Sequence, residues 1–241
     1  PSATMASPFS PTPSAGDTPA TPPSSQFSVV LFDFGAKANI QCELKKRDCK
    51  VTVVPYDTTA EKIIALAPDG IMLSNGPGDP AENVNTIEEI RKLCEWNKET
   101  RRLRVPKSSN EVVSTGSTTT LKKPIPIFGI CLGHQMLALA RGAKTSKLKY
   151  GHRGGNQPVK DLESGRVFIS SQNHGYAVEN DSLPSCAKLR FVNTNDGTCE
   201  GIEYTDIPAF SVQFHPEACS GPHDTNFLFD LFLEMMKNAT E

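Results

Sequence analysis

Short, continuously apolar runs alternate with helical patterns in the first part of the chain. The runs predict buried strands at 27–32, 50–54, 70–73 and 126–130. Continuous apolar or β-branched runs of this length are typical of parallel strands that are covered on both faces. The segments between them predict helices over about 37–47, 58–67, 80–94 and 131–140. Strands that alternate with helices predict an α/β fold with a mostly parallel central sheet flanked by helices.

The second half of the chain has a different pattern. Strand-like segments separated by short turns are expected at 166–171, 188–193, 199–203 and 209–214. A terminal helix is expected after Asp224, with an apolar stripe that predicts its buried face. The stripe consists of Phe227, Leu228, Leu231, Phe232 and Met235.

Two segments interrupt this organisation. Residues 1–26 contain seven Pro, six Ser and four Thr with one charge, so they predict a disordered linker before a single domain at 27–241. Residues 97–124 carry seven basic and two acidic residues around a Ser/Thr-rich centre. We interpret this stretch as a surface insertion, because insertions in loops cost little free energy. A basic docking or regulatory loop is the alternative.

Composition excludes several classes of protein. The chain has 25 Lys and Arg against 27 Asp and Glu, so its net charge of −2 argues against a nucleic-acid partner. No apolar run approaches ~18 residues, so no membrane partner is expected. The cysteine count of seven is odd, and neither C-x-x-C nor zinc spacing occurs. We therefore expect reduced thiols, a cytoplasmic location and no metal site.

The segment Gly129-Ile-Cys131-Leu-Gly133 joins a predicted strand to a predicted helix. This is the cysteine form of a nucleophile elbow, a sharp turn that lifts a nucleophile above the edge of a sheet. Cys131 would lie at a helix N-terminus, whose dipole and free N–H groups stabilise a thiolate. The N–H of Leu132 would point to the place where an oxyanion forms. The alternative is a buried cysteine beside a tight turn.

A cysteine nucleophile needs a base, and the chain has five histidines. His215 meets the requirement best, because it follows the predicted strand 209–214 and catalytic groups collect at the carboxyl ends of parallel strands. Glu217 is placed to hold the other imidazole nitrogen. His-x-Glu is a weak signal by itself, because surface histidines often have acidic neighbours. The other histidines are His134 on the elbow helix, His152 in an expected Gly-rich turn, His174 and His223.

The turn Ser74-Asn-Gly76-Pro-Gly78-Asp-Pro80 follows the third predicted strand. Its glycines and prolines make a rigid loop with exposed amides, which are able to supply a second oxyanion donor. An ordinary strand–helix connection is the alternative.

Together these motifs resemble the class I, or triad, glutamine amidotransferases. The segments 74–80, 151–158 and 171–178 make the chain similar to the glutaminase domain of carbamoyl phosphate synthetases. The resemblance runs from about Phe27 to Glu234. It implies the class I amidotransferase fold and the hydrolysis of L-glutamine to glutamate and ammonia, with the ammonia passed to a synthetase domain for pyrimidine biosynthesis.

The resemblance also implies a role for each matching residue. Cys131 is the implied nucleophile, His215 the acid and base, and Glu217 the group that orients His215. The backbone N–H groups of Gly78 and Leu132 are the implied oxyanion hole. The implied glutamine-binding residues are Gly76, Gln135, Asn173, Gly175 and Tyr176, the last at a position where the family often has Phe.

The resemblance to carbamoyl phosphate synthetases also implies partners for this domain. The domain itself needs no cofactor, and ATP, Mg²⁺ and bicarbonate belong to an ATP-grasp synthetase domain or subunit. Small subunits carry a further N-terminal domain, so we expect this chain to be an excised glutaminase domain of a fused, eukaryotic-type protein. Two alternatives remain open. One is a glutaminase that serves anthranilate, GMP or CTP synthesis, and the other is a non-catalytic scaffold with the same fold.

Overall fold

A computed structural model describes residues 27–104, 123–218 and 224–240. The predicted linker at 1–26 lies outside these residues. The strands are β1 (Phe27–Asp33), β2 (Cys49–Pro55), β3 (Gly70–Leu73), β4 (Ile127–Ile130), β5 (Thr145–Asp161), β6 (Val167–Val178), β7 (Ala187–Asn193), β8 (Cys199–Tyr204) and β9 (Ala209–Val212). The helices are α1 (Ala38–Lys45), α2 (Ala60–Ala65), α3 (Val84–Arg104), α4 (Leu132–Ala140) and α5 (Phe227–Thr240), with 3-10 turns η1 (Pro80–Glu82) and η2 (Asn180–Ser182).

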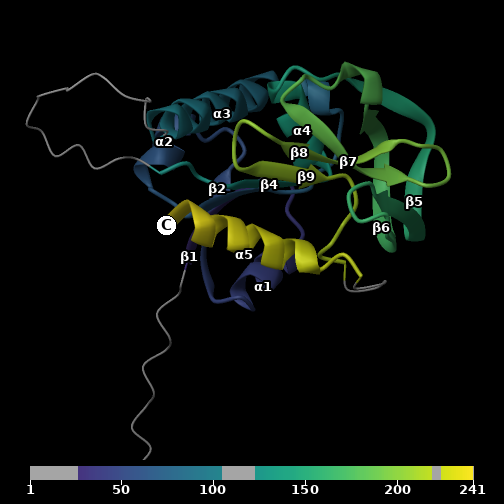
Figure 1. Ribbon diagram of the computed structural model, residues 1–241, viewed down its shortest axis with the longest axis horizontal. Helices are drawn as coiled ribbons and strands as arrows, with labels where there is room; N and C mark the ends of the chain where they lie inside the picture. Colours follow the sequence, from purple (N-terminus) through teal and green to yellow (C-terminus); the bar gives the residue numbers. More distant parts are fainter. Residues whose placement is uncertain (1–26, 105–122, 219–223, 241) are drawn as a thin grey trace, which may run out of the picture.

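One nine-stranded sheet runs through the described residues in the order β2-β1-β3-β4-β9-β8-β7-β5-β6. The strands β2, β1, β3, β4 and β9 are parallel, whereas β8, β7, β5 and β6 join by antiparallel pairing. The predicted mostly parallel sheet is therefore confirmed for the half that contains β2, β1, β3, β4 and β9, and the other half is antiparallel. Figure 1 shows the long β5–β6 pair standing at the end of the sheet away from β2.

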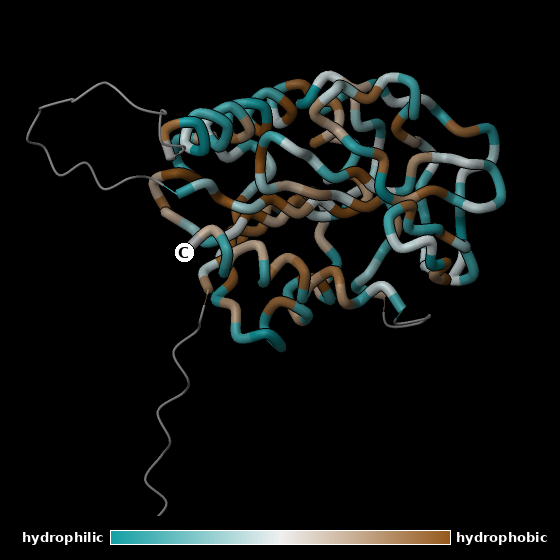
Figure 2. Tube along the Cα trace, viewed as in Figure 1, coloured by the Kyte–Doolittle hydropathy of each residue, from teal (hydrophilic) through white to brown (hydrophobic). Residues whose placement is uncertain are grey.

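Helices cover both faces of the parallel half (Figure 1). Side chains from α2, α3 and α4 pack on one face, and those from α1 and α5 pack on the other. The inner strands β3, β4 and β9 are buried at every residue, and Figure 2 shows hydrophobic positions concentrated there. Phe128 stacks on Phe210 with ring centroids 4.3 Å apart. This two-sided burial is the physical reason for the continuous apolar runs in the sequence.

The parallel arrangement brings the carboxyl ends of β1, β3, β4 and β9 to one edge of the sheet. The segments that leave this edge contain the turn 74–80, the elbow at Cys131 and the segment that leads to His215. Loops at this edge of parallel α/β sheets form binding sites. The topology thus gathers motifs that lie far apart in the sequence.

The predicted insertion begins too early in the sequence. Residues 97–104 are the last turns of α3, not a structureless loop. Asn97 is 1% exposed, and its side chain accepts from Ile125 N at 2.6 Å and donates to Ile125 O at 2.8 Å. These two hydrogen bonds hold the helix against the chain that enters β4. Residues 105–122 lie outside the described residues, so the remainder of the insertion stays a prediction.

Two further expectations need correction. Residues 145–161 form β5, which the sequence did not predict, and His152 therefore lies in a strand rather than a turn. The buried face of α5 is also rotated from the predicted stripe. Phe227 is 40% exposed, whereas Phe229, which we did not assign to that face, is fully buried.

The corrected face of α5 can be tested by substitution. Phe232→Ala should lower the free energy of unfolding by about 3–5 kcal/mol, because the ring is fully buried and packs near Phe128. Phe227→Ala, on the exposed side of the same helix, should cost about 1 kcal/mol or less. Urea unfolding measures both values. Equal losses would show that the helix does not bury this face.

Candidate active site

The elbow is the strained point of the site. Cys131 connects β4 to α4 with φ 53° and ψ −103°, a conformation that residues with a side chain rarely adopt. Its N–H donates to Val212 O at 2.9 Å, and its carbonyl accepts from Gln135 N at 3.1 Å. The residue is 5% exposed. Backbone strain of this kind is concentrated at functional sites, where the surrounding structure holds it in place.

The two glycines of the elbow are required by close backbone approach. A Cβ on Gly129 would meet Gly133 O at 2.9 Å, and a Cβ on Gly133 would meet Leu73 O at 2.3 Å. Gly133 N donates to Ser74 O at 3.0 Å, so the first turn of α4 lies directly on the end of β3. The Gly-x-Cys-x-Gly pattern is thus a steric consequence of bringing β3, β4 and α4 together at one point.

His215 is the histidine that the structure brings to the thiol. Its Nδ1 lies 2.8 Å from Glu217 Oε1, and the Cys131 side chain is close enough to act on its pKa. Burial on its own lowers the pKa of His215, but the interactions with Cys131 and Glu217 outweigh it and raise the pKa to about 9. The imidazole is thus held protonated at neutral pH between a thiol and a carboxylate.

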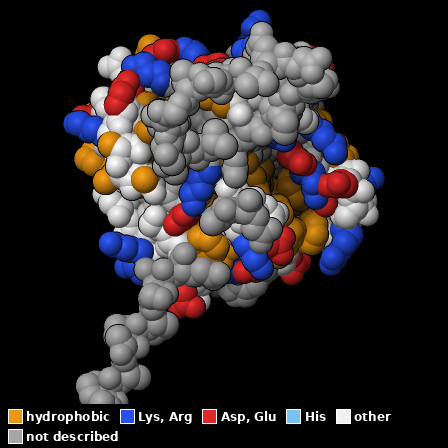
Figure 3. Space-filling model, turned by 60° about the vertical axis from the view of Figure 1, so that its left-hand side comes forward, with side chains coloured by type: hydrophobic (Ala, Val, Ile, Leu, Met, Phe, Trp, Pro, Cys, Tyr) orange, Lys and Arg blue, Asp and Glu red, His pale blue; other side chains and the backbone are white. Residues whose placement is uncertain are grey.

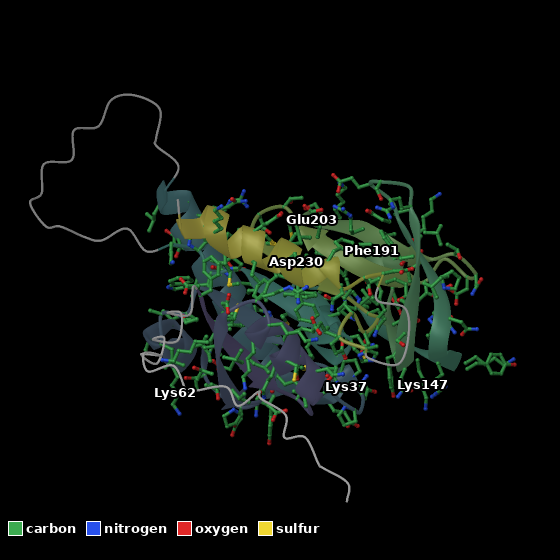
Figure 4. All side chains as sticks on the ribbon, turned by 90° about the horizontal axis from the view of Figure 1, so that it is seen from below. Lys37, Lys62, Lys147, Phe191, Glu203 and Asp230 are labelled. Atoms are coloured by element: carbon green, nitrogen blue, oxygen red, sulfur yellow. The ribbon has the colours of Figure 1, made fainter. Side chains whose placement is uncertain are left out.

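Glu217 has a buried side chain with a cation beside it. The Nζ of Lys37 lies 3.6 Å from Glu217 Oε1, and Asn39 Nδ2 donates to Glu217 O at 3.2 Å. Lys37, labelled in Figure 4, immediately precedes α1. Lys37 was not among the predicted site residues. Its position just after β1, the strand whose carboxyl end reaches the same edge, is a signal that could have pointed to it.

The turn 74–80 packs against the elbow. A Cβ on Gly76 would meet Phe34 O at 2.2 Å and the Leu132 side chain at 2.8 Å. Gly78 has φ +100°, a backbone conformation that favours glycine. No atom lies within 4 Å of a Cβ added there, so the requirement for glycine comes from the backbone and not from crowding. As the first residue of α4, Leu132 has an N–H without an intrahelical acceptor.

Of the predicted glutamine-binding residues, Gly76 lies in the turn 74–80 and the others lie on α4 and β6. Gln135 Nε2 donates to Tyr176 O at 2.7 Å and to Gln213 Oε1 at 2.8 Å, so both amide hydrogens are engaged and Oε1 remains for a ligand. The Asp79 carboxyl group lies close enough to the Tyr176 hydroxyl to raise the pKa of Tyr176, so β6 lies near the turn 74–80. Asn173 is exposed.

Other histidines differ from His215 in their surroundings. His134 is fully buried, with Nδ1 2.8 Å from Ser211 Oγ, and burial lowers its pKa to about 3. Burial likewise lowers the pKa of His174 to about 4. His152 contacts Glu200 and Asp196, which raise its pKa to about 9. His223 lies outside the described residues.

Cavity size does not identify this site. A cavity of about 880 Å³ lies between α5 and β7–β9, lined by apolar residues including Phe210, Leu231 and Met235, but not by Cys131 or His215. Figure 3 shows a hollow on this face with hydrophobic side chains among charged ones. A smaller cavity of about 460 Å³ borders the elbow at Leu132 and the turn at Pro77.

Comparison with known proteins agrees with this geometry. The family "Glutamine amidotransferase class-I" matches residues 30–100 and 108–235. The chain therefore belongs to the class I glutamine amidotransferases, as predicted. A solved structure of a putative GMP synthase component from Thermoplasma acidophilum superposes with a TM-score of 0.68. It covers 88% of this chain and 94% of its own at 20% identity, which shows the same fold.

The relatives found by sequence similarity belong to a narrower group within this family. The carbamoyl phosphate synthase small chain of Staphylococcus epidermidis is 49% identical over 225 residues, covering 93% of this chain and 54% of that protein. The small chain of Bacillus cereus is 51% identical over 211 residues, covering 87% of this chain and 50% of that protein. The chain spans about half the length of these relatives.

Strain at the elbow predicts a stability difference between two inactive variants. Cys131→Gly should be more stable than Cys131→Ala by about 1 kcal/mol or more, because only glycine adopts a positive φ at little cost. Both variants lack the thiol, so the comparison isolates the backbone. Chemical unfolding of the two proteins measures the difference. A more stable alanine variant would contradict a strained elbow.

Proposed function

We propose that this chain hydrolyses L-glutamine to glutamate and ammonia through a thioester on Cys131, and that the ammonia passes to a carbamoyl phosphate synthetase domain. The observation that carries the proposal is the strained Cys131 beside His215, whose pKa it helps to raise and whose Nδ1 lies 2.8 Å from Glu217 Oε1. A nucleophile, a base and a group that orients the base are the elements of covalent acyl transfer.

In the first half of the reaction, Cys131 attacks the carboxamide carbon of glutamine as a thiolate, its proton being the one that His215 carries. The carbonyl electrons move to the oxygen, where the N–H groups of Leu132 and Gly78 stabilise the negative charge. As the electrons return, the C–N bond breaks and His215 gives its proton to the departing nitrogen. The products are ammonia and a γ-glutamyl thioester.

In the second half, His215 has no proton on the nitrogen that faces the thioester. It accepts a proton from water as the water oxygen attacks the thioester carbon. The C–S bond breaks, glutamate leaves and the sulfur is restored. Glu217 holds Nδ1 of His215 through both steps, which fixes the ring and stabilises its charged form.

Substrate binding is assigned to the groups around this centre. Gln135 Oε1, the backbone at Gly76, and the segment of β6 that contains Asn173, Gly175 and Tyr176 would contact the amide and amino-acid ends of glutamine. The effect of Asp79 on the pKa of Tyr176 supports this assignment, because it places β6 near the turn that carries the second oxyanion donor.

The ammonia acceptor is proposed from sequence similarity. Identity near 50% to carbamoyl phosphate synthase small chains supports a synthetase that uses ATP, Mg²⁺ and bicarbonate, together with the N-terminal domain that we expect. The GMP synthase relative supports only the fold. With amide-labelled glutamine, the label should enter carbamoyl phosphate when a synthetase subunit is added. Transfer to GMP, CTP or anthranilate instead would favour the alternative acceptors.

The proposed role of His215 predicts a pH profile. Turnover of glutamine should fall as the pH rises through about 9, because His215 loses the proton that it donates to ammonia. Glu217→Gln removes a contact that raises the pKa of His215, so the fall should move to lower pH. His215→Asn should lower kcat at least ~100-fold at every pH.

Measurement of ammonia release between pH 6 and pH 10 tests this profile, with Glu203→Gln on the exposed side of β8 as the control. The control should keep the wild-type profile. An alkaline fall that stays at the same pH in Glu217→Gln would contradict the assigned contact between Glu217 and His215.

A further inference from the structure

A buried polar network lies directly behind the proposed glutamine-binding strand. Residues along β6 alternate between its two sides, as strand geometry requires. Gln172 and His174 are 3% and 6% exposed, whereas Asn173 between them is exposed. The side chains that enter the network therefore come from the same short segment as the residues that we assign to glutamine.

Glu200 on β8 is the centre of this network. Its side chain is 0% exposed, and both of its oxygens are engaged. Gln172 Nε2 donates to Oε2 at 2.9 Å, His152 Nδ1 donates to Oε1 at 3.2 Å, and Asn193 Nδ2 lies 3.5 Å from Oε1. A buried carboxyl group is stable only with such partners. Glu200 thus connects β5, β6 and β7 from a single position.

The cation of the network is His152. Its two ring nitrogens face two carboxylates, with Nε2 2.8 Å from Asp196 Oδ2 and Nδ1 facing Glu200. The hydrogen bond to Glu200 and that to Asp196 outweigh burial and raise the pKa of His152 to about 9, so the ring is charged at neutral pH. The imidazolium compensates the charge placed on these two carboxyl groups.

The network continues to the backbone of the binding segment. His174 Nε2 lies 3.1 Å from Gln172 Oε1 and its Nδ1 lies 2.8 Å from Tyr176 O, so the neutral ring donates its single N–H to one of these two oxygens. Tyr176 O accepts from Gln135 Nε2. At the other end of the segment, Ser171 O accepts from the N–H of His215 at 2.9 Å. The chain of contacts from Glu200 therefore reaches both the substrate side of β6 and the catalytic histidine.

We propose that Glu200 and His152 are positioning residues for glutamine: they hold Gln172 and His174, and through them fix the binding conformation of the segment from Asn173 to Tyr176. This inference rests on the proposed glutaminase function. Neither residue touches the reacting atoms. Their effect should appear in the affinity for glutamine rather than in the rate of the chemical step at saturation.

The test compares three substitutions on one strand, in the full 241-residue chain. Glu200→Ala removes the acceptors of Gln172 and His152, and should raise the KM for glutamine about tenfold with less than about a threefold change in kcat. Glu200→Gln keeps the size of the side chain but only one acceptor, because its amide nitrogen donates, so its KM should lie between those of wild type and Glu200→Ala. Glu203→Ala on the same strand, whose carboxylate contacts Arg190, is the matched control and should leave KM unchanged. Glu203 is labelled in Figure 4.

Two further measurements separate positioning from a merely structural role. Alkylation of Cys131 by iodoacetamide does not require the glutamine pocket and should proceed at the wild-type rate in Glu200→Ala. Thermal unfolding reports any loss of stability independently. If Glu200→Ala does not fold, His152→Asn is measured instead, with the same expected rise in KM.

An unchanged KM in a folded variant, with or without a lower Tm, would overturn the inference. A wild-type chain that alkylates normally at Cys131 but releases no ammonia from glutamine would instead contradict the proposed function. The two failures therefore give different results.

Discussion

The close approach of β3, β4 and the first turn of α4 is the constraint on which the site depends. Gly133 lies so near Leu73 O that no side chain fits between them, and Cys131 takes a positive φ as a result of the abrupt change from strand to helix. Packing on both faces of the sheet holds this arrangement. The thiol is thus presented at the sheet edge by backbone geometry, at the start of α4 and within hydrogen-bonding reach of His215.

Much of this arrangement could be predicted from the sequence, because it depends on local patterns. The apolar runs predicted β1, β3 and β4, since burial on both faces leaves little choice of residue, whereas β9 was expected among the strand-like segments of the second half. Gly129 and Gly133 around Cys131 predicted the elbow, and the structure gives the steric reason. The position of His215 at the end of a strand predicted its encounter with the thiol.

Other features depend on contacts that leave no local pattern. The strand β5 is rich in polar residues and glycine because most of its length is exposed, so neither alternation nor apolar runs indicate it. The end of α3 was placed too early because Asn97 looks like a surface residue, and its burial depends on two hydrogen bonds to Ile125 across the fold. Glu200 and Lys37 have their significance only through partners distant in the sequence.

The central claim is that Cys131 carries the glutamyl group during turnover, and a direct measurement is available. The protein is mixed with glutamine, quenched in acid within milliseconds to seconds, digested and analysed by mass spectrometry, with Cys131→Ser treated in parallel. The account predicts a γ-glutamyl adduct on the peptide that contains Cys131, formed and lost in step with ammonia release, and no thioester in the variant. Ammonia release without such an adduct, or an adduct on another cysteine, would contradict it.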